Sequence, residues 1–233
     1  AVWLVGTRGP GLTVLANHSI PPYRKRGTGE EETRLRVLLA TLLRQAGVEP
    51  DFALADPHDA PVCAEGFRFT FGDAAIIALL ADADGGKVKT ALRLNGNAFV
   101  YNMLTGMPVA RPERTRAILE PGRPALFSEL PYELSGFALE APDRVQAGRR
   151  LRMYVSQKTK EGLAGNHLVR IGLVRLDGRE LPHYAQVILC KGGFGEGFFP
   201  LAANEFPEDY RITARDLLTG RQSEVTVRVV SNL

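Results

Sequence analysis

The sequence is poor in the side chains on which redox, metal and many catalytic sites depend. It contains two cysteines, four histidines and one tryptophan in 233 residues. Cys63 and Cys190 lie far apart and match no metal-ligand spacing, so a single disulfide stays open as an alternative, while burial as two small apolar side chains is favoured. The histidines form no recognisable ligand set either, and we predict no metal site and no cofactor.

Long apolar runs and charge of one sign are missing as well. No stretch of 18 apolar residues occurs, which predicts no membrane span. The 29 lysines and arginines nearly balance the 26 aspartates and glutamates. Because both signs are interleaved, the sequence lacks the concentrated basic face of a nucleic-acid-binding protein. A hydrophobic share of 45% is typical of a packed globular chain rather than a disordered one.

The motifs of common active sites are absent too. No G-x-S-x-G nucleophile elbow occurs, and the glycine-rich residues 6–11 lead into no helix, so they indicate a turn rather than a phosphate cradle. The acidic residues mostly lie beside Gly or Pro, where carboxylates cap turns. The loop Asp56-Pro57-His58-Asp59 offers metal ligands but has no second ligand group at a recognisable spacing. We therefore predict no catalytic residues.

The pattern of apolar residues and turns predicts an α/β segment over residues 1–51. Two short apolar runs, 1–5 and 12–16, are separated by a Gly-Pro-Gly turn. Thr28 and Glu31 form a capping box, and leucines then recur at helical spacing. Gly47 is a good residue to end the helix. This segment predicts one amphipathic helix and is too small to stand alone.

From Phe67 onward apolar residues recur at every second position instead of at helical spacing. Phenylalanines alternate with polar residues over 67–71, which predicts a half-buried strand. The apolar run Ala74–Ala81 could be helix or strand, and its shortness and flanking turns favour a buried strand. Further short strands separated by turns predict a small β-sandwich over 52–130.

A second series of strands follows a boundary at Pro131-Tyr132. The strand spacing predicts an immunoglobulin-like sandwich over 131–233, and Asp177-Gly178 is a hairpin signal. His167 and His183 are expected to begin the two strands of that hairpin and to form a structural pair. The predicted fold class is thus mainly β, with two antiparallel β-sandwich units behind a short α/β segment.

Some of these residues resemble a known family. Phe69-Thr70-Phe71-Gly72-Asp73-Ala74, and residues 99–102 with the Leu104-Thr105-Gly106 turn, resemble the small C-terminal β-domain of bacterial family-42-type β-galactosidases and their relatives. The chain departs from that pattern at Asn102, where the family has Asp, and at Met107-Pro108. The α/β segment resembles the end of the flavodoxin-like trimerisation domain that precedes this β-domain.

The last hundred or so residues resemble an immunoglobulin-like or macroglobulin-like β-sandwich of large bacterial surface proteins, through residues 166–170, 197–202 and 215–220. The resemblance implies a catalytic barrel upstream of this chain, and it implies that domain and a homo-oligomer as partners. Because the chain opens directly on a strand-like run, we expect it to be part of a longer protein. The sequence does not define a compartment.

Three functions follow as hypotheses. The favoured one is a non-catalytic structural or assembly module at the C-terminal end of a bacterial carbohydrate-active protein, hence not an enzyme. The alternative is a carbohydrate-binding module, in which Phe194, Phe198 and Phe199 around a Gly-rich turn present rings to a polysaccharide; for these residues core packing or a partner interface is favoured. The third is a self-sufficient hydrolase that uses paired acidic turn residues.

Overall fold

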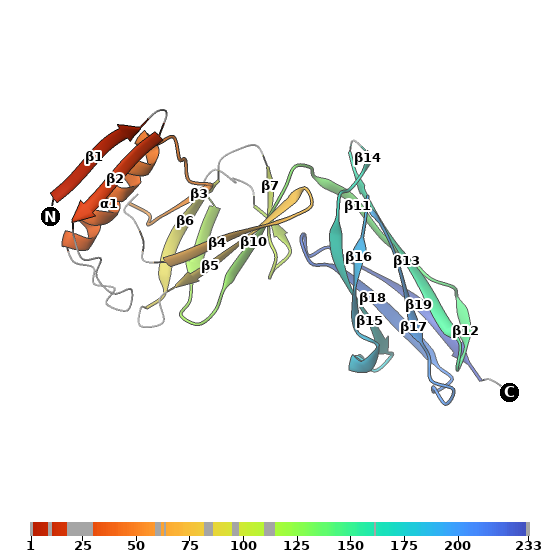
Figure 1. Cartoon of the computed structure of the whole chain (residues 1–233). Helices are drawn as coiled ribbons and strands as arrows, with labels where there is room; N and C mark the ends of the chain where they lie inside the picture. Colours follow the sequence, from red (N-terminus) through yellow and green to blue (C-terminus); the bar gives the residue numbers. More distant parts are fainter. Residues whose placement is uncertain are drawn as a thin grey trace. The chain divides into compact units, whose positions relative to one another are not determined.

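The computed structural model describes residues 2–8, 11–17, 30–58, 62, 64–81, 86–94, 98–109, 115–160 and 162–231. The chain divides into two compact units, Ala1–Asp51 and Phe52–Leu233, whose elements are labelled in Figure 1. Strands dominate, and one α-helix occurs among the described residues. The predicted fold class, mainly β with antiparallel sandwiches behind an α/β segment, is confirmed.

The first unit opens with a two-stranded sheet. Strands β1 (Val2–Arg8) and β2 (Gly11–Asn17) pair antiparallel, with Arg8 opposite Gly11. The connection between them is two residues long, which joins antiparallel strands but is far too short for a parallel crossover. The pairing therefore differs from the parallel layer that a flavodoxin-like domain would have.

Helix α1 (Glu30–Gln45) follows and confirms the predicted amphipathic helix. It ends in a Schellman motif: Gly47 has a φ of 77°, and the Val48 amide donates to the Leu43 carbonyl at 2.9 Å. The predicted Thr28 cap lies outside the described residues. In the described part of the chain, no helix combines the length and the apolar character that crossing a membrane requires.

The second unit begins with the N-terminal sandwich, two sheets with antiparallel pairing throughout. The smaller sheet has the order β3-β6-β9 and the larger one β4-β5-β10-β7-β8. The strands are β3 (Phe52–Ala55), β4 (Ala64–Phe71), β5 (Ala74–Ala81), β6 (Val88–Leu94), β7 (Phe99–Asn102), β8 (Met107–Pro108), β9 (Thr115–Leu119) and β10 (Ala125–Leu130).

The core of this sandwich lies between its two sheets. Ile77 and Leu79 from β5 meet Leu92 from β6 and Leu119 from β9, and all four side chains are fully buried. The predicted buried strand Ala74–Ala81 is confirmed by this packing. Its period-two burial arises because alternate side chains of a strand point to opposite faces of the sheet.

The neighbouring strand β4 corrects one prediction. Phe67 and Phe69 are 44% and 55% exposed, so the expected half-buried strand is wrong for these two side chains. In the β4–β5 register they lie opposite Ala78 and Ile76, on the face that points away from the core. The alternation was recognised correctly, but the sequence does not reveal which face of the strand is buried.

The C-terminal sandwich also has two sheets. One contains β11 (Leu134–Glu140), β13 (Arg150–Thr159) and β17 (Phe194–Pro200), with β14 (Gly162–Leu163) at one end of β13. The other has the order β12-β19-β18-β15-β16. Its strands are β12 (Arg144–Gln146), β15 (His167–Arg175), β16 (Gln186–Cys190), β18 (Asp209–Asp216) and β19 (Gln222–Val230), and a 3-10 turn, η2 (Pro182–Tyr184), precedes β16.

This second sandwich is immunoglobulin-like, as predicted. The short strand β12 pairs parallel to β19, whereas the other named strand pairs of the sandwich are antiparallel. Tyr210, near the start of β18, donates its hydroxyl to the Phe206 carbonyl at 3.1 Å. A tyrosine that reaches back to upstream backbone at this place is the tyrosine corner of immunoglobulin-like domains.

Candidate functional site

The Gly-rich turn predicted near residue 194 leads into strand β17, whose side chains alternate strictly. Phe194 and Phe198 point outward and are 54% and 44% exposed, whereas Phe199 is 1% exposed and belongs to the core. Phe199 therefore cannot offer its ring to a sugar, which corrects the prediction for that residue. The reason is the period of two: adjacent residues of a strand cannot share a face.

Strand β13 completes this surface, here called the aromatic face: the outward side chains of β13 and β17, together with Glu140 of β11, which pairs with Tyr154. Tyr154 stacks on Phe194, with ring centroids 6.0 Å apart and an interplanar angle of 22°. The Arg150 guanidinium lies over Phe198, 4.9 Å from the ring centroid. No local pattern in the sequence points to Tyr154 or Arg150, because β17 follows β13 only after about 35 residues and the contact between these strands depends on long-range pairing.

The aromatic face is charged as well as apolar. Arg152 and Glu196 approach to 3.7 Å, and both side chains are at least half exposed, so the pair contributes little. No carboxylate pairs with Arg150 within the residues that the structure describes. The charged side chains of the face are Arg150, Arg152, Lys158, Glu140 and Glu196.

Close packing beneath β17 holds this surface in place. A Cβ added at Gly195 would lie 2.5 Å from the Cys190 Sγ, and one at Gly197 would lie 3.2 Å from Ile188 Cγ2. Strand β16 therefore packs directly on the inner side of β17, where larger residues would push the strands apart. The outward rings thus stand on a tightly packed strand.

A buried polar chain occupies the end of the C-terminal sandwich near Pro131. Nδ1 of His167 lies 3.0 Å from Asp216 Oδ1, and its Nε2 lies 3.1 Å from Tyr132 Oη. The Gly165 amide donates to the same Oη at 2.8 Å. The tyrosine hydrogen is then available to donate to Nε2, which places the imidazole hydrogen on Nδ1, facing Asp216.

Asp216 is satisfied from several sides although it is fully buried. Its carboxylate accepts the amides of Leu218 and Thr219, at 3.3 and 3.2 Å, and the Thr219 hydroxyl. Charge-assisted bonds of this kind compensate the desolvation of an anion. A tyrosine, a histidine and an aspartate in a row have the composition of a catalytic relay, but here His167 and Asp216 are fully buried, Tyr132 is partly buried, and all three are joined by structural hydrogen bonds.

The predicted pairing of His167 with His183 is wrong. The β15–β16 ladder sets His167 opposite Cys190, and His183 lies in η2 with its ring 4.3 Å from that of Tyr184. The Asp177-Gly178 turn does form, and Gly178 donates to the Arg175 carbonyl at 2.9 Å. The strand does not resume at once, because η2 intervenes before β16.

Cys190 is a free, fully buried thiol. Burial, reinforced by the charge of Asp216, raises the pKa of this thiol to about 11. A neutral thiol at physiological pH is a poor nucleophile and a poor metal ligand. The other cysteine, Cys63, lies outside the described residues.

The two sandwiches meet where the β18–β19 turn reaches the outer face of the sheet that contains β10 and β7. We call this contact the junction. Leu218 is 1% exposed and clusters with Ala74, Tyr101 and Leu130 of the N-terminal sandwich. Ser128, also fully buried, donates to the Leu218 carbonyl at 2.5 Å. The junction is thus an apolar contact with a buried hydrogen bond at its centre.

Backbone contacts surround this centre. The Arg215 guanidinium donates to the carbonyls of Met103 and Leu104, at 3.2 and 3.0 Å. Gly106 and Gly220 have φ values of 71° and 70°, and a Cβ on Gly220 would overlap the Cα of Gly106. Two turns therefore touch at a point that leaves no room for a side chain.

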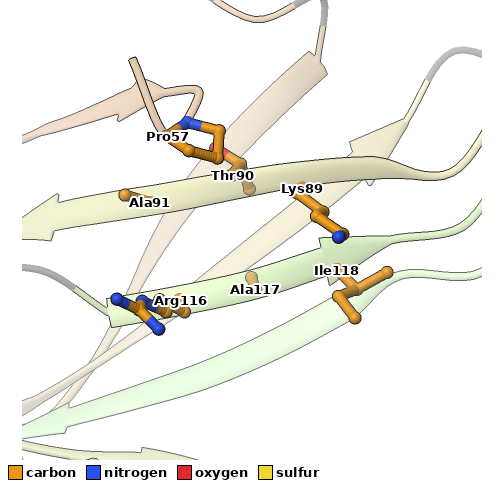
Figure 2. A pocket seen from close by; sticks show the side chains of 7 residues that line it. All are labelled: Pro57, Lys89, Thr90, Ala91, Arg116, Ala117 and Ile118. Atoms are coloured by element: carbon orange, nitrogen blue, oxygen red, sulfur yellow. The ribbon is translucent and has the colours of Figure 1, made fainter. Parts of the chain in front are cut away.

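A pocket of about 490 Å³ lies on strands β6 and β9. Figure 2 shows Lys89 and Ala91 on one strand and Arg116 and Ile118 on the other. Its floor is largely apolar and its two charged side chains are cationic, so it has the composition to accept a small anion.

The loop that begins at Asp56, considered above for its possible metal ligands, lies beside this pocket and forms an ordinary turn at Asp56–His58. The His58 amide donates to Asp56 Oδ1 at 2.8 Å, the hydrogen bond by which Asp stabilises a turn. Asp59 lies outside the described residues. Over the described ranges, no three His, Cys, Asp or Glu side chains are grouped so as to hold a metal ion.

Comparison with known proteins gives partial likenesses. No protein-family model and no curated protein matches the sequence. The structure of Salmonella α-2-macroglobulin reacted with methylamine is similar at 14% identity and a TM-score of 0.35, over 79% of this chain and 18% of that one. Listeria innocua β-glucosidase in complex with isofagomine is similar at 16% identity and 0.28, over 42% of this chain and 17% of that one.

The chain thus spans 17–18% of the length of these two proteins. At such identities and TM-scores the likenesses carry no argument about function. They do not confirm the resemblance to family-42 β-galactosidases.

Proposed function

We propose that this chain is a non-catalytic accessory module of a bacterial carbohydrate-active protein, in which two β-sandwiches joined in a fixed relation support a catalytic domain elsewhere in the same protein. The junction carries the proposal. A flexible pair of domains needs only a linker, whereas here Leu218 of one sandwich is buried in the surface of the other.

The energetics of the junction favour a persistent contact. Fully burying one leucine stabilises by about 1.5–3 kcal/mol, and Ser128 adds a buried hydrogen bond to the Leu218 carbonyl. Separating the sandwiches would also leave the Met103 and Leu104 carbonyls without their guanidinium donor. Each of these contacts joins residues about 90 or more positions apart in the sequence.

The buried polar chain connects this junction to the interior of the C-terminal sandwich. Asp216 holds the backbone of Leu218 and Thr219, and His167 ties Asp216 to Tyr132. Tyr132 follows the boundary between the two sandwiches directly. Hydrogen bonds therefore connect the β18–β19 turn, which contacts the N-terminal sandwich, to the segment that links the two sandwiches. This connection supports a structural rather than a catalytic role for these side chains.

The test uses the complete protein that contains this chain. We expect that removing residues 52–233 lowers its thermal stability or changes its oligomeric state in light scattering. Leu218→Ala in the complete protein should reproduce part of that effect, and Leu176→Ala, at an exposed leucine of the same sandwich, should not. Unchanged stability and oligomeric state after the deletion would overturn the proposal.

Carbohydrate binding is a second candidate function, and the aromatic face is the observation that favours it. Sugars stack their C–H faces on exposed rings, and Tyr154, Phe194 and Phe198 present rings beside hydrogen-bonding side chains. Such a function is compatible with the first, because the face lies on β13 and β17, and the junction residues come from other strands and turns.

A further inference from the structure

We infer that the aromatic face binds a linear glycan that carries carboxylate or sulfate groups. The inference rests on the second candidate function, carbohydrate binding, and adds the chemical class of the ligand. It follows from three features of the face: the spacing of its rings, the position of Arg150 without a carboxylate partner among the described residues, and the packing that holds β17.

The spacing of the rings indicates an extended ligand. Phe194 and Phe198 are four residues apart on one strand, and at about 3.3 Å per residue their Cα atoms are about 13 Å apart. Both rings are about half exposed. That span exceeds a single sugar ring, so a ligand that contacts both platforms lies along β17 as a chain.

The charges of the face indicate an acidic ligand. The Arg150 guanidinium lies over the Phe198 ring and has no carboxylate partner among the described residues. A guanidinium held in this way presents donors that match a carboxylate or sulfate bidentately. Arg152, which lies opposite Phe198, makes an exposed 3.7 Å contact with Glu196, which a ligand anion can replace at little cost.

The two acids of the face restrict where the anion binds. Glu196 and Glu140 both lie level with Tyr154, between the two phenylalanine platforms. The Phe198 end, beside Arg150 and Arg152, is therefore the cationic end of the face. We place the acidic group of the ligand there and the stacking of a further sugar at Phe194.

Rigidity favours binding at this surface. β17 pairs with β13 through seven successive residues, and β16 packs against its inner side at Gly195 and Gly197. Rings on such a strand lose little conformational freedom when a ligand arrives, so less of the contact energy is lost to ordering.

The experiment titrates the full chain, by calorimetry, with an oligogalacturonate, with a sulfated oligosaccharide, and with a neutral galacto-oligosaccharide of equal length. We expect the acidic glycans to bind at least about tenfold more tightly than the neutral one, with an affinity that falls as salt is added. Arg150→Gln should abolish this preference, and Phe198→Ala should weaken the binding of every glycan about tenfold.

Matched controls separate the site from the rest of the chain. Phe69→Ala removes an exposed ring of the other sandwich, and Arg144→Gln removes an exposed arginine on the opposite sheet; neither should change any affinity. Thermal unfolding of each variant checks that it is folded.

The outcomes separate two claims: that the aromatic face binds carbohydrate, and that the carbohydrate is acidic. Equal affinity for acidic and neutral glycans, lost with Phe198→Ala, would overturn the acidic ligand and leave carbohydrate binding standing. No binding of any glycan at millimolar concentration would overturn both. A dimer in light scattering that Phe198→Ala dissolves would assign the face to self-association instead and would likewise overturn both.

Discussion

His167 is the middle residue of the buried polar chain in the C-terminal sandwich. Both of its ring nitrogens are engaged, by Asp216 on one side and Tyr132 on the other, and the side chain is fully buried. A buried polar group costs little when every hydrogen bond is made and much when one partner is removed.

We therefore predict that His167→Leu lowers the free energy of unfolding by about 3 kcal/mol, because the buried Asp216 carboxylate loses one of its donors and the Tyr132 hydroxyl loses its acceptor. Denaturant unfolding measures the change. His183→Ala, an exposed histidine in η2, is the control and should cost less than about 1 kcal/mol. Equal losses of unfolding free energy for the two substitutions would show that the buried polar chain does not stabilise the sandwich more than an exposed side chain does.

Cys190 gives a prediction for alkaline pH. The pKa of this thiol is raised from 9.0 to about 11 by burial and by Asp216. Between these values the unfolded chain releases its thiol proton while the folded chain retains it, so the stability that the thiol contributes is full below pH 9 and falls as the pH rises toward 11.

The measurement compares unfolding of the chain with that of Cys190→Ala, both in a Cys63→Ser background, at pH 8 and pH 10.5. The stability advantage of the thiol-bearing chain should be smaller at pH 10.5. In the same background, the thiol should react with a disulfide reagent at pH 8 only after unfolding. Rapid reaction of the folded chain would contradict the burial.

At the scale of elements, the contact between two turns is the most demanding feature. Gly106 and Gly220 both have positive φ, and each would place a Cβ against the other's backbone. A side chain there has two costs: the left-handed backbone, about 1–2 kcal/mol, and the steric displacement of the facing turn.

We predict that Gly220→Ala destabilises the chain by more than about 2 kcal/mol in denaturant unfolding. Gly178→Ala is the matched control, because Gly178 has a φ of 88° but no atom within 4 Å of its added Cβ. It should show the backbone cost alone, about 1–2 kcal/mol. A Gly220→Ala effect no larger than that of Gly178→Ala would mean that the turns do not press on each other.

Local signals predicted the elements well. The apolar spacing and Gly47 defined α1, and the apolar run Ala74–Ala81 became the buried strand β5. The predictions that failed concern contacts between residues far apart in the sequence. The sequence does not show which face of β4 meets the core, so Phe67 and Phe69 were assigned to the wrong side. The prediction of a histidine pair failed because His183 lies in η2, before β16 begins, and His167 lies opposite Cys190 instead.

The candidate site was predictable only in part, for the same reason. The Gly-rich turn made Phe194, Phe198 and Phe199 candidates, but the alternation of β17 excludes Phe199, which the period of two turns inward. Tyr154 and Arg150 join the face through the pairing of β13 with β17. The buried chain of Tyr132, His167 and Asp216 comes from three separate segments, which no local pattern connects.

At the scale of the molecule, the second unit consists of two sandwiches that share a small core of their own. Leu218 contributes from one side, and Tyr101 and Leu130 contribute from the other. If the junction is persistent, a substitution on one side of it should change the stability of the strands on the other side. Domains joined only by a linker would unfold and fluctuate independently.

Amide hydrogen exchange of Leu218→Ala, followed by mass spectrometry, tests this coupling most directly. We predict faster exchange in β18 and β19 of the mutated sandwich, and also in β7 and β10 of the N-terminal sandwich, whose Tyr101 and Leu130 lose their buried neighbour. Leu176→Ala, at an exposed leucine, should leave β7 and β10 unchanged. Faster exchange confined to the C-terminal sandwich in Leu218→Ala would contradict the account.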